Sequence, residues 1–425
     1  MKQIKAVVIG LGDRGGIYAN YSLVKPEELK IVGVVDTNPF KLELGKTRFN
    51  LEDKYLFSNV EDCLNSDLDV DLYINATMDE IHYEILTKVL KTGKAVLTEK
   101  PIVNNKEQLL ELQDLATKYN TQVFVGHVLR YTPFYKTIKE LIMNDEIGQI
   151  RSIEAAEHIG SAHYAGSYIR GRWKSRKSCG SSLLLAKSCH DIDIICWLNN
   201  ESEPVSVTSY GGRYYFNEEN APEGATSFCY NCPHEKNCYF SAIKMYFESN
   251  FSAEQTFIKL NKENVTDEDK INFLKTDDFG RCVFKMPDSD MEDRQVAIIN
   301  FKNGSVCSFA LVGACPEANR TISIIGTKGE IEGKIEDGII HLKKNKFNSV
   351  IPEVTTIDVN KDIHQGGLFG GHSGGDYEIM KSLVAYLNGD RSAVTITKLS
   401  DSINGHLCVY AADESLESNI TVKIK

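Results

Sequence analysis

The fold of this chain is decided near its start, by the stretch Lys5-Ala6-Val7-Val8-Ile9-Gly10-Leu11-Gly12-Asp13-Arg14-Gly15. Residues 5–9 are mostly apolar and β-branched, which is typical of a buried strand. The next six residues have the spacing Gly-x-Gly-x-x-Gly. Glycines at these positions allow a tight turn and let the backbone approach a pyrophosphate, which is then held at the N-terminus of the following helix. Because glycine-rich turns are common, the pattern needs support from the residues around it.

That support comes from a second predicted strand, Ile31–Val35, which ends in Asp36. An acidic residue about 20 positions after the glycines is where a dinucleotide-binding domain holds the adenosine ribose hydroxyls. Asp36 would repel a 2′-phosphate, so the sequence favours NAD(H) over NADP(H), although Lys41 lies close enough to keep NADP(H) open. The alternative interpretation is a glycine turn and a capping aspartate in another α/β domain.

The alternation of strands and helices continues along the first part of the chain. We expect strands over residues 70–76, 95–98 and 122–126, and helices over residues 82–92 and 106–119. Such alternation predicts βαβ units and a doubly wound parallel sheet of the Rossmann type, over residues 1–130. Ligands of these sheets lie beyond the carboxyl ends of the strands. Four polar residues fall at or just past such ends, namely Thr77, Glu99, Lys100 and His127.

From about Thr132 the pattern changes. After a predicted helix over residues 134–143 and a strand over 150–158, strand-like runs follow without regular helices between them, at residues 205–211, 295–301, 305–313 and 321–326. This order predicts an α+β domain with a large, mostly antiparallel open sheet over residues 131–425. A helix over residues 376–387 is expected to pack near the domain junction.

Length and charge limit the classes of function. A chain of 425 residues is too long for one hydrophobic core, which agrees with two domains. The net charge of −11 argues against nucleic acid or an anionic membrane surface as the main partner, since both favour clustered Lys and Arg. No apolar run long enough for a transmembrane helix is present. Without a leader pattern, the 11 cysteines are expected to stay reduced in a cytoplasmic protein.

Several motifs together resemble the glucose–fructose oxidoreductase / inositol dehydrogenase family, written Gfo/Idh/MocA. They are the glycine-rich turn with Asp36, then Ala76-Thr77, then the family signature Glu99-Lys100-Pro101, and the crossover stretch 126–133. The resemblance runs from Lys5 to about Leu387. It implies an NAD-dependent oxidoreductase that acts on a hydroxyl or ketone of a sugar, sugar derivative or cyclitol. It also implies a homo-oligomer, a dimer or tetramer, formed through the open sheet.

The resemblance also implies which residues meet the cofactor. Contacts with NAD(H) are expected from Gly10, Gly12, Asp13, Arg14, Gly15, Asp36, Thr77, His82, Glu99, Lys100 and His127. Among these, Lys100 would lie beside both the nicotinamide and the substrate, so it is also a catalytic candidate.

A second catalytic candidate, His190, lies in the segment Leu183–Leu198. The spacing of Ile192, Ile195 and Leu198 predicts a buried helix that starts near His190. An imidazole there can accept a proton as hydride leaves a carbinol carbon. The alternative is a capping or core histidine. The resemblance favours the base, because the family places its catalytic histidine in a pattern that ends His-x-Ile-Asp.

The chain departs from the family pattern four residues before His190. Many family dehydrogenases carry an aspartate there, whereas this chain has Ala186, followed by Lys187. We expect Lys187 to replace the carboxylate in the active site, either by lowering the pKa of His190 or by binding substrate oxygens. The alternative is a surface or ion-paired lysine.

Substrate contacts are expected on both sides of this segment. Arg and aromatic side chains suit polyhydroxylated or anionic ligands, and His372 lies in the stretch Gly370–Asp376, which is similar to a His-Gly-Gly stretch that lines the active site in the family. The alternative for this stretch is a flexible glycine-rich connector. The candidates are His163, Tyr168, Arg170, Trp173, Asp191 and His372.

The last motif is a group of cysteines. Cys229, Cys232 and Cys238 have a spacing that suits a structural zinc site, with Cys282 or His234 as the fourth ligand. The alternative is a loop of reduced cysteines that approach one another without metal.

Three functions therefore remain open. The first is a sugar or cyclitol dehydrogenase. The second is an NAD-dependent glycosidase that oxidises a sugar carbon transiently with no net redox change, which the missing aspartate makes a serious alternative. The third is a ligand-sensing regulator that binds the dinucleotide without turnover, although the presence of both Lys100 and His190 argues against it.

Overall fold

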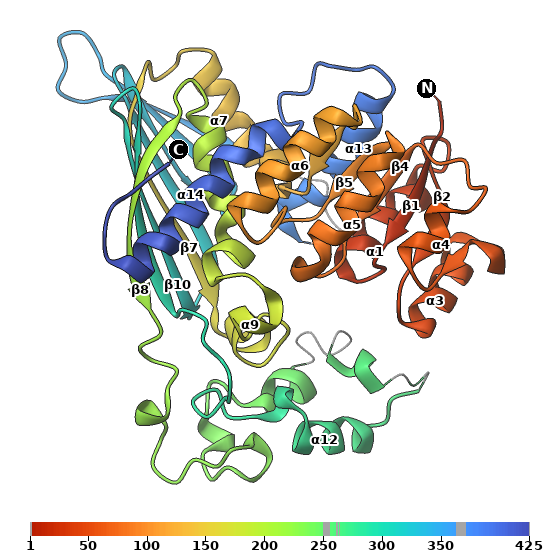
Figure 1. Ribbon diagram of the computed structural model, residues 1–425. Helices are drawn as coiled ribbons and strands as arrows, with labels where there is room; N and C mark the ends of the chain where they lie inside the picture. The colour runs from red at the N-terminus through yellow and green to blue at the C-terminus, as the bar shows by residue number, and fades with distance from the viewer. Residues whose placement is uncertain (1, 250–255, 261, 263, 363–370, 425) are drawn as a thin grey trace.

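The computed structural model describes residues 2–249, 256–260, 262, 264–362 and 371–424. Two sheets stand side by side, a parallel sheet built from the first part of the chain and a larger, mostly antiparallel sheet built from the second (Figure 1). Helices α7 (Pro133–Met143) and α14 (Leu399–Ser418) lie on the side of the large sheet that faces the parallel sheet. The predicted fold class is confirmed.

The parallel sheet has the order β3-β2-β1-β4-β5-β6. Every pair in it is parallel, as expected for a Rossmann domain. Its strands are β1 (Ile4–Ile9), β2 (Leu29–Val35), β3 (Leu56–Phe57), β4 (Leu72–Asn75), β5 (Ala95–Thr98) and β6 (Val123–Val125). Its helices are α1 (Asp13–Ala19), α2 (Tyr21–Val24), α3 (Pro39–Phe49), α4 (Val60–Leu64), α5 (His82–Val89) and α6 (Lys106–Lys118).

The large sheet has the order β14-β13-β12-β11-β7-β10-β9-β8-β15. It is antiparallel except at its centre, where β10 pairs with β7 in parallel. The strands are β7 (Ile150–Gly160), β8 (Pro204–Gly212), β9 (Arg294–Phe301), β10 (Val306–Cys315), β11 (Asn319–Gly326), β12 (Gly329–Lys334), β13 (Ile339–Lys344), β14 (Glu353–Asp358) and β15 (Val422–Lys423). The sequence predicted β7 to β11 and missed the other four.

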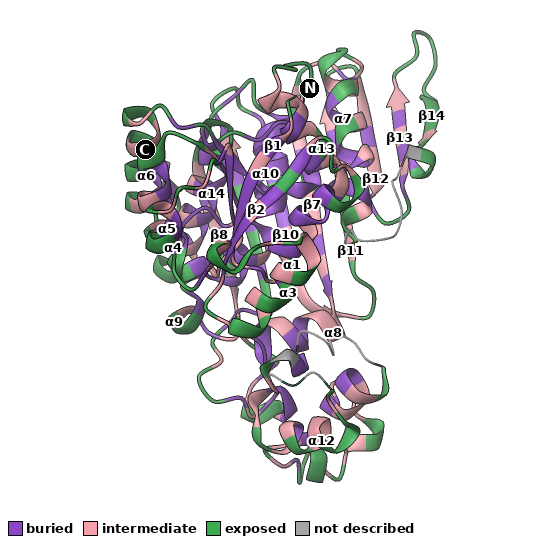
Figure 2. Cartoon of the chain, turned by 90° about the vertical axis from the view of Figure 1, so that its right-hand side faces the viewer, coloured by how far each residue is buried: buried purple, intermediate pink, exposed green. Residues whose placement is uncertain are grey.

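The helices near the junction bring distant parts of the chain together. Helix α10 (Cys189–Leu198) is buried at all ten of its positions, and Figure 2 shows it among the buried strands. Helix α13 (Gly375–Leu387) packs Ile379, Met380 and Leu383 into the core of the parallel sheet, beside Val8. The C-terminal part of the chain therefore completes the first core and joins it to the second half.

Irregular segments connect these elements next to the junction. A 3₁₀ turn, η4 (Val128–Tyr131), follows β6, and two π-helical turns, η5 (Tyr164–Ile169) and η6 (Leu184–Ser188), precede α10. The short helices α8 (Ser161–His163) and α9 (Arg176–Cys179) lie between them. Turns of the π type are rare and are frequently found at functional sites, although a third one, η10 (Ile243–Glu248), lies in the extension between β8 and β9.

An extension between β8 and β9, which carries α12 (Asp267–Thr276), projects beyond one end of the sheets (Figure 1). Figure 2 shows mostly partly buried and exposed residues in it. Among the described residues, no helix is both long enough and apolar enough to cross a bilayer.

Candidate active site

The glycine-rich turn connects β1 to α1 in a shape that only glycine permits. Gly10 has a φ of +86°, and a Cβ there would lie 2.7 Å from the carbonyl oxygen of Ala76. A Cβ on Gly15 would lie 2.1 Å from the carbonyl oxygen of Gly10. A Cβ on Gly12, by contrast, would meet only the Lys41 Nζ, at 3.7 Å. The turn is therefore closed towards the protein and open on its outer side, which fits the close approach of a dinucleotide diphosphate.

Asp36 is held beside this turn at the end of β2. Its carboxylate accepts hydrogen bonds from the backbone N–H groups of Leu11 and Asn38, both at 2.9 Å. The ammonium group of Lys41 lies 3.9 Å from the same carboxylate. This arrangement fixes the carboxylate beside the glycine-rich turn and keeps Lys41 near it.

Arg14 and Glu99, two predicted cofactor contacts, bind each other. The Arg14 Nε donates to Glu99 at 2.8 Å and its Nη1 donates to Asp376 at 2.6 Å. Tyr18 also donates to Glu99. Burial raises the pKa of Glu99, but Arg14 and Lys100 outweigh it, so the pKa lies below its ordinary value. The network ties α1, the end of β5 and α13 together.

Lys100 follows strand β5 of the parallel sheet and His190 lies in helix α10, and the fold brings the two side chains near each other. The Lys100 Nζ donates to the carbonyl oxygen of Ala186, at 2.6 Å, in the π-helical turn before α10. His190, in the first turn of α10, is 6% exposed. Burial, then Lys100, His127 and His372, hold the pKa of His190 well below its ordinary value. The imidazole is therefore neutral near neutral pH, the form that can accept a proton.

Lys187 belongs to a buried cluster of charges. Its Nζ lies 3.4 Å from Glu157, which is also ion-paired with Arg320, and the Arg320 Nε lies 2.9 Å from Asp191. Burial, before other causes, lowers the pKa of Lys187 and raises that of Asp191 to about 7. Lys187 is therefore ion-paired, as the alternative interpretation of this residue predicted. Lys100 is nevertheless near enough to lower the pKa of Lys187.

His372 stands beside His190 with a carboxylate behind it. The two ring centroids are 6.4 Å apart, and the His372 Nδ1 lies 3.0 Å from the Asp376 Oδ2. Despite burial, the contacts with His372 and Arg14 lower the pKa of Asp376 to about 2, so this carboxylate is ionised. Lys100, Lys187, His190 and His372 therefore lie near enough for their charges to affect one another. Gly370, at the start of this stretch, lies outside the described residues.

The aromatic candidates pack against one another beside the charged cluster of Lys187, Glu157 and Arg320. The Tyr168 ring centroid lies 5.7 Å from that of His163 and 6.3 Å from that of Trp173. Burial, then Lys187, lowers the pKa of His163 to about 3. The Trp173 indole N–H donates to Asp79 at 3.1 Å.

Two candidates point away from this group. The Arg170 guanidinium donates to the carbonyl oxygens of Arg281 and Phe240, so it holds the extension rather than facing His190. Both ring nitrogens of the buried His82 face carbonyl oxygens, Nδ1 that of Pro101 at 2.7 Å and Nε2 that of Thr77 at 3.1 Å. His82 thus shapes the loops that carry Thr77 and Lys100 instead of lying open to a cofactor.

The structure does not support the expected zinc site. In the described ranges, no group of three or more His, Cys, Asp or Glu side chains is arranged to hold a metal ion. Cys229 instead accepts from Arg170 at 3.5 Å, and His234 faces the carbonyl oxygen of Glu223 at 2.7 Å. Burial, before the neighbouring thiols Cys229 and Cys232, raises the pKa of both Cys238 and Cys282. Cys229 and Cys232 therefore lie near enough to Cys238 and Cys282 to affect the pKa of both thiols.

Several residues of the site escaped the sequence analysis. Glu157 and Arg320 occupy ordinary strand positions in β7 and β11, and no local pattern distinguishes them. The pair Arg130 and Asp193 had a signal, since Asp193 belongs to the His-x-Ile-Asp pattern and Arg130 to the crossover stretch. Asp376 was predicted only as the first residue of a helix, whereas it binds both Arg14 and His372.

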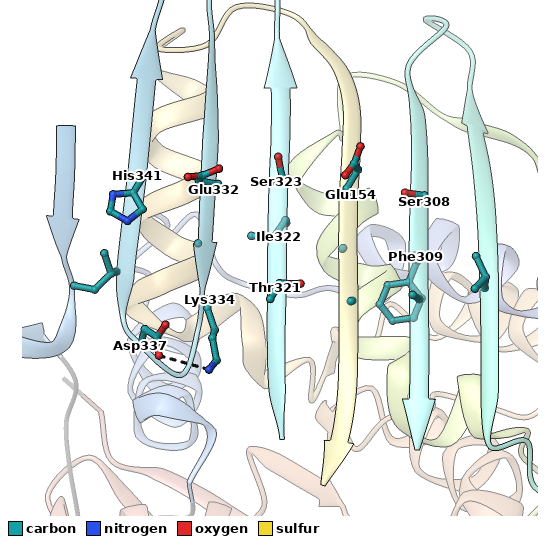
Figure 3. A pocket seen from close by; sticks show the side chains of 16 residues that line it. Glu154, Ser308, Phe309, Thr321, Ile322, Ser323, Glu332, Lys334, Asp337 and His341 are labelled. Atoms are coloured by element: carbon teal, nitrogen blue, oxygen red, sulfur yellow. Dashed lines mark ion pairs between the residues drawn. The ribbon is translucent and has the colours of Figure 1, made fainter. Parts of the chain in front are cut away.

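A separate hollow of about 660 Å³ lies on the large sheet, away from these residues (Figure 3). Short side chains such as Ser308, Thr321 and Ser323 line it, with Glu154 and Glu332 beside them. It contains none of the candidate site residues, so the chemistry of the chain is concentrated at the junction instead.

Two family models match consecutive parts of the chain. One is described as an oxidoreductase family with an NAD-binding Rossmann fold and matches residues 4–127. The other is described as the C-terminal alpha/beta domain of the oxidoreductase family and matches residues 139–424. Together they cover nearly all of the chain.

Curated proteins and solved structures agree with these matches. The chain is 26% identical to the putative oxidoreductase YteT of Bacillus subtilis (strain 168), over 83% of this chain and 82% of that protein. It is 23% identical to inositol 2-dehydrogenase of Rhizobium meliloti (strain 1021), over 48% of this chain and 56% of that one. Levoglucosan dehydrogenase, solved with NADH and levoglucosan, has a TM-score of 0.71 at 17% identity and 99% coverage of both chains, which shows a shared fold.

Proposed function

Because the chain belongs to the Gfo/Idh/MocA family of oxidoreductases, whose first domain is an NAD-binding Rossmann fold, we propose that it transfers hydride between NAD(H) and a hydroxyl or ketone of a sugar, sugar derivative or cyclitol. The observation that carries the proposal is the neutral, buried imidazole of His190 beside the Lys100 ammonium, at the junction of the two halves. Relatives named for inositol and levoglucosan support the substrate class.

The residues at the junction divide the chemistry between them. When bound, NAD accepts the hydride from the carbinol carbon. His190 takes the hydroxyl proton, because its pKa keeps the ring neutral. Lys100 stabilises the negative charge that develops on the substrate oxygen. Lys187, His372 and the aromatic side chains around Tyr168 orient the substrate hydroxyls.

The proposal extends to the cofactor and the domains. Asp36 selects NAD(H) by binding the ribose hydroxyls, in a first domain of residues 1–130, and residues 131–425 supply the substrate side. Gly10, Gly12 and Gly15 admit the diphosphate.

Two substitutions test this mechanism. Lys100→Met and His190→Ala are each expected to lower turnover about 100-fold or more and to leave NAD bound, because each removes a chemical step and no ribose contact. The assay follows dihydronicotinamide absorbance across a panel of sugars and cyclitols, with NAD binding measured by tryptophan fluorescence. Near-native turnover by either variant would contradict its assigned role.

One observation favours a second candidate, a glycosidase that uses NAD without net redox change. Ala186 stands where a carboxylate would pair with His190, so a different set of proton transfers is open to the site. Release of p-nitrophenol from p-nitrophenyl glycosides, dependent on NAD but without accumulation of NADH, would establish this candidate and displace the dehydrogenase. Tight NAD binding without either reaction would instead point to a regulator.

We also propose that a second copy of the chain covers the open face of the large sheet. Apolar side chains of β8, β9 and β10 are exposed there, including Tyr210, Val296, Ile298 and Val306. The shallow hollow of Figure 3 lies on the same sheet. Light scattering should find an oligomer, and Val296→Glu together with Ile298→Glu should dissociate it. A native protein that is monomeric at high concentration would refute the proposal.

A further inference from the structure

The proton acceptor His190 has an unmet structural requirement. Its Nδ1 is buried and has no hydrogen-bond partner in the part of the chain that the structure describes. Since Nδ1 is buried, Nε2 is the nitrogen left to meet a substrate. A neutral imidazole can accept a proton at Nε2 only if its own proton sits on Nδ1, and that N–H needs an acceptor. The neighbouring helical position 186 is an alanine and supplies none.

His127 is placed to supply that acceptor. It lies at the end of β6, is 1% exposed, and meets His190 edge to face with ring centroids 5.5 Å apart. Within the described residues neither of its ring nitrogens has a hydrogen-bond partner. Burying ring nitrogens without partners is unfavourable, so the position of this imidazole calls for a role. A hydrogen bond between the Nδ1 atoms of the two rings would give each of them the partner that it lacks.

Asp193 stands on the other side of His127. The His127 Nε2 lies 3.6 Å from the Asp193 Oδ1. Arg130 donates to both oxygens of this carboxylate, each at 2.6 Å, and so fixes it in place. A carboxylate accepts only, so it favours the tautomer of His127 that carries its proton on Nε2 and a lone pair on Nδ1.

A third imidazole, that of His406, also lies next to His127, but both of its ring nitrogens already have hydrogen-bond partners. The His406 ring centroid also lies 5.5 Å from that of His127. However, the His406 Nε2 accepts from the Ile102 N–H at 3.0 Å, and its Nδ1 faces the carbonyl oxygen of Ser402 at 3.2 Å. Both nitrogens are occupied, which leaves His190 as the imidazole that His127 can serve.

We propose that His127 is a positioning residue which, with Asp193, sets the tautomer of His190. Asp193 accepts the Nε2–H of His127, and the His127 Nδ1 accepts the Nδ1–H of His190. The His190 Nε2 then has a free lone pair for the hydroxyl proton. During oxidation the hydride goes to NAD and the hydroxyl proton goes to the His190 Nε2, while His127 stays neutral and keeps its hydrogen bond. This inference rests on the proposed function, in which His190 is the base.

The series of Asp193, His127 and His190, called the histidine line below, differs from a direct carboxylate–histidine pair in how strongly it stabilises the charged form of His190. The nearest group to the His190 Nδ1 is a neutral ring, so the imidazolium is stabilised less and its pKa stays low. Charged or titratable groups facing His190 are Lys100, His127, His372 and Arg320. Those facing His127 are Arg130, Lys100, Glu99, Asp193, His190 and His406.

The matched pair His127→Phe and His127→Gln tests the histidine line in the full-length enzyme with NAD. Phe fills the space and has no acceptor, whereas the Gln amide can both accept and donate. His127 was predicted as an NAD(H) contact, but at 1% exposure it is enclosed by the protein and is not open to a cofactor. We therefore expect His127→Phe to lower kcat by about 10- to 100-fold with KM and NAD affinity unchanged, and to shift the acid limb of the kcat profile to lower pH. His127→Gln should stay within about threefold of native. His234→Phe, in the extension between β8 and β9, serves as the control.

Native kcat and pH profile in a folded His127→Phe would overturn the inference. That outcome is distinct from failure of the proposed function, which is signalled by activity in His190→Ala. If His127→Phe does not fold, nitrogen-15 NMR of histidine in the native enzyme decides the question. It should show His190 protonated at Nδ1 and His127 at Nε2, and the opposite tautomer of His190 would refute the histidine line.

Discussion

The pair of Arg130 and Asp193 offers the sharpest test of how the two halves of the molecule are held together. Arg130 in η4 and Asp193 in α10 are each 1% exposed at the side chain, and two hydrogen bonds of 2.6 Å join them. Arg130 Nη2 also donates to the carbonyl oxygen of Asp401, at 3.1 Å. Arg130→Met keeps most of the side-chain volume and removes the charge.

The expected loss follows from the carboxylate left behind. A buried carboxylate without its partner costs about 3–5 kcal/mol, since neither water nor another cation can replace the guanidinium. This free energy corresponds to about two to four powers of ten in the unfolding equilibrium constant. Asp193→Leu in the same background removes the stranded charge and is expected to recover a large part of the loss.

Urea titration followed by tryptophan fluorescence measures these changes. Trp197 reports directly, because the Arg130 guanidinium lies 5.4 Å from the centre of its ring. The control is Lys5→Met, which breaks the exposed pair of Lys5 and Asp69 and should leave the midpoint unchanged. A loss below about 1 kcal/mol in Arg130→Met, or no recovery in the double variant, would refute the reasoning.

Three further predictions concern the cofactor turn and one buried acid. Native protein should bind NAD(H) more tightly than NADP(H), and Asp36→Ser should reduce this difference in affinity. Fluorescence titration with both cofactors measures it, and a native protein that prefers NADP(H) would assign the selection to Lys41. Gly15→Ala should abolish NAD binding in the same titration, since its Cβ would lie 2.1 Å from a carbonyl oxygen, and retained affinity would contradict that geometry. Burial raises the pKa of Asp413 to about 7. The unfolded state releases this proton at a lower pH than the folded state does, so the stability of the folded state falls as the pH rises towards 7. Asp413→Asn should therefore melt at a higher temperature than native protein at about pH 8 and at a similar one at about pH 4, and equal melting at both values would show the acid to be unperturbed.

Much of the fold was predictable because its signals are local. Strand β5 was predicted at its observed bounds, and β1, β2, β4 and β6 to within two residues at each end, because an apolar run of this length between turns has few other structures. Helix α14 was missed, although it is the longest helix described. Its buried positions include Ser402, Gly405 and Ser415 as well as apolar residues, so no single apolar face marks it in the sequence.

The site was predictable to a smaller extent. Lys100 and His190 carry motifs, and the structure brings them to one place. Arg170 and His82 have side chains suited to ligands, but their hydrogen bonds go to backbone carbonyl oxygens, which residue type alone does not reveal. The cysteine spacing predicted a metal centre, and the described thiols are not arranged to form one.

The sequence by itself determined the dinucleotide turn, because Gly10 and Gly15 meet backbone atoms that no other residue would accommodate. It also determined the order of strands and helices, which follows from periodicities of a few residues. Only the tertiary structure decided which charges meet. Arg14 reaches Asp376 across 362 positions, and Arg130 reaches Asp193 across 63. Such pairs have no period and no local signal, since the free energy that selects them arises only when folding removes both groups from water.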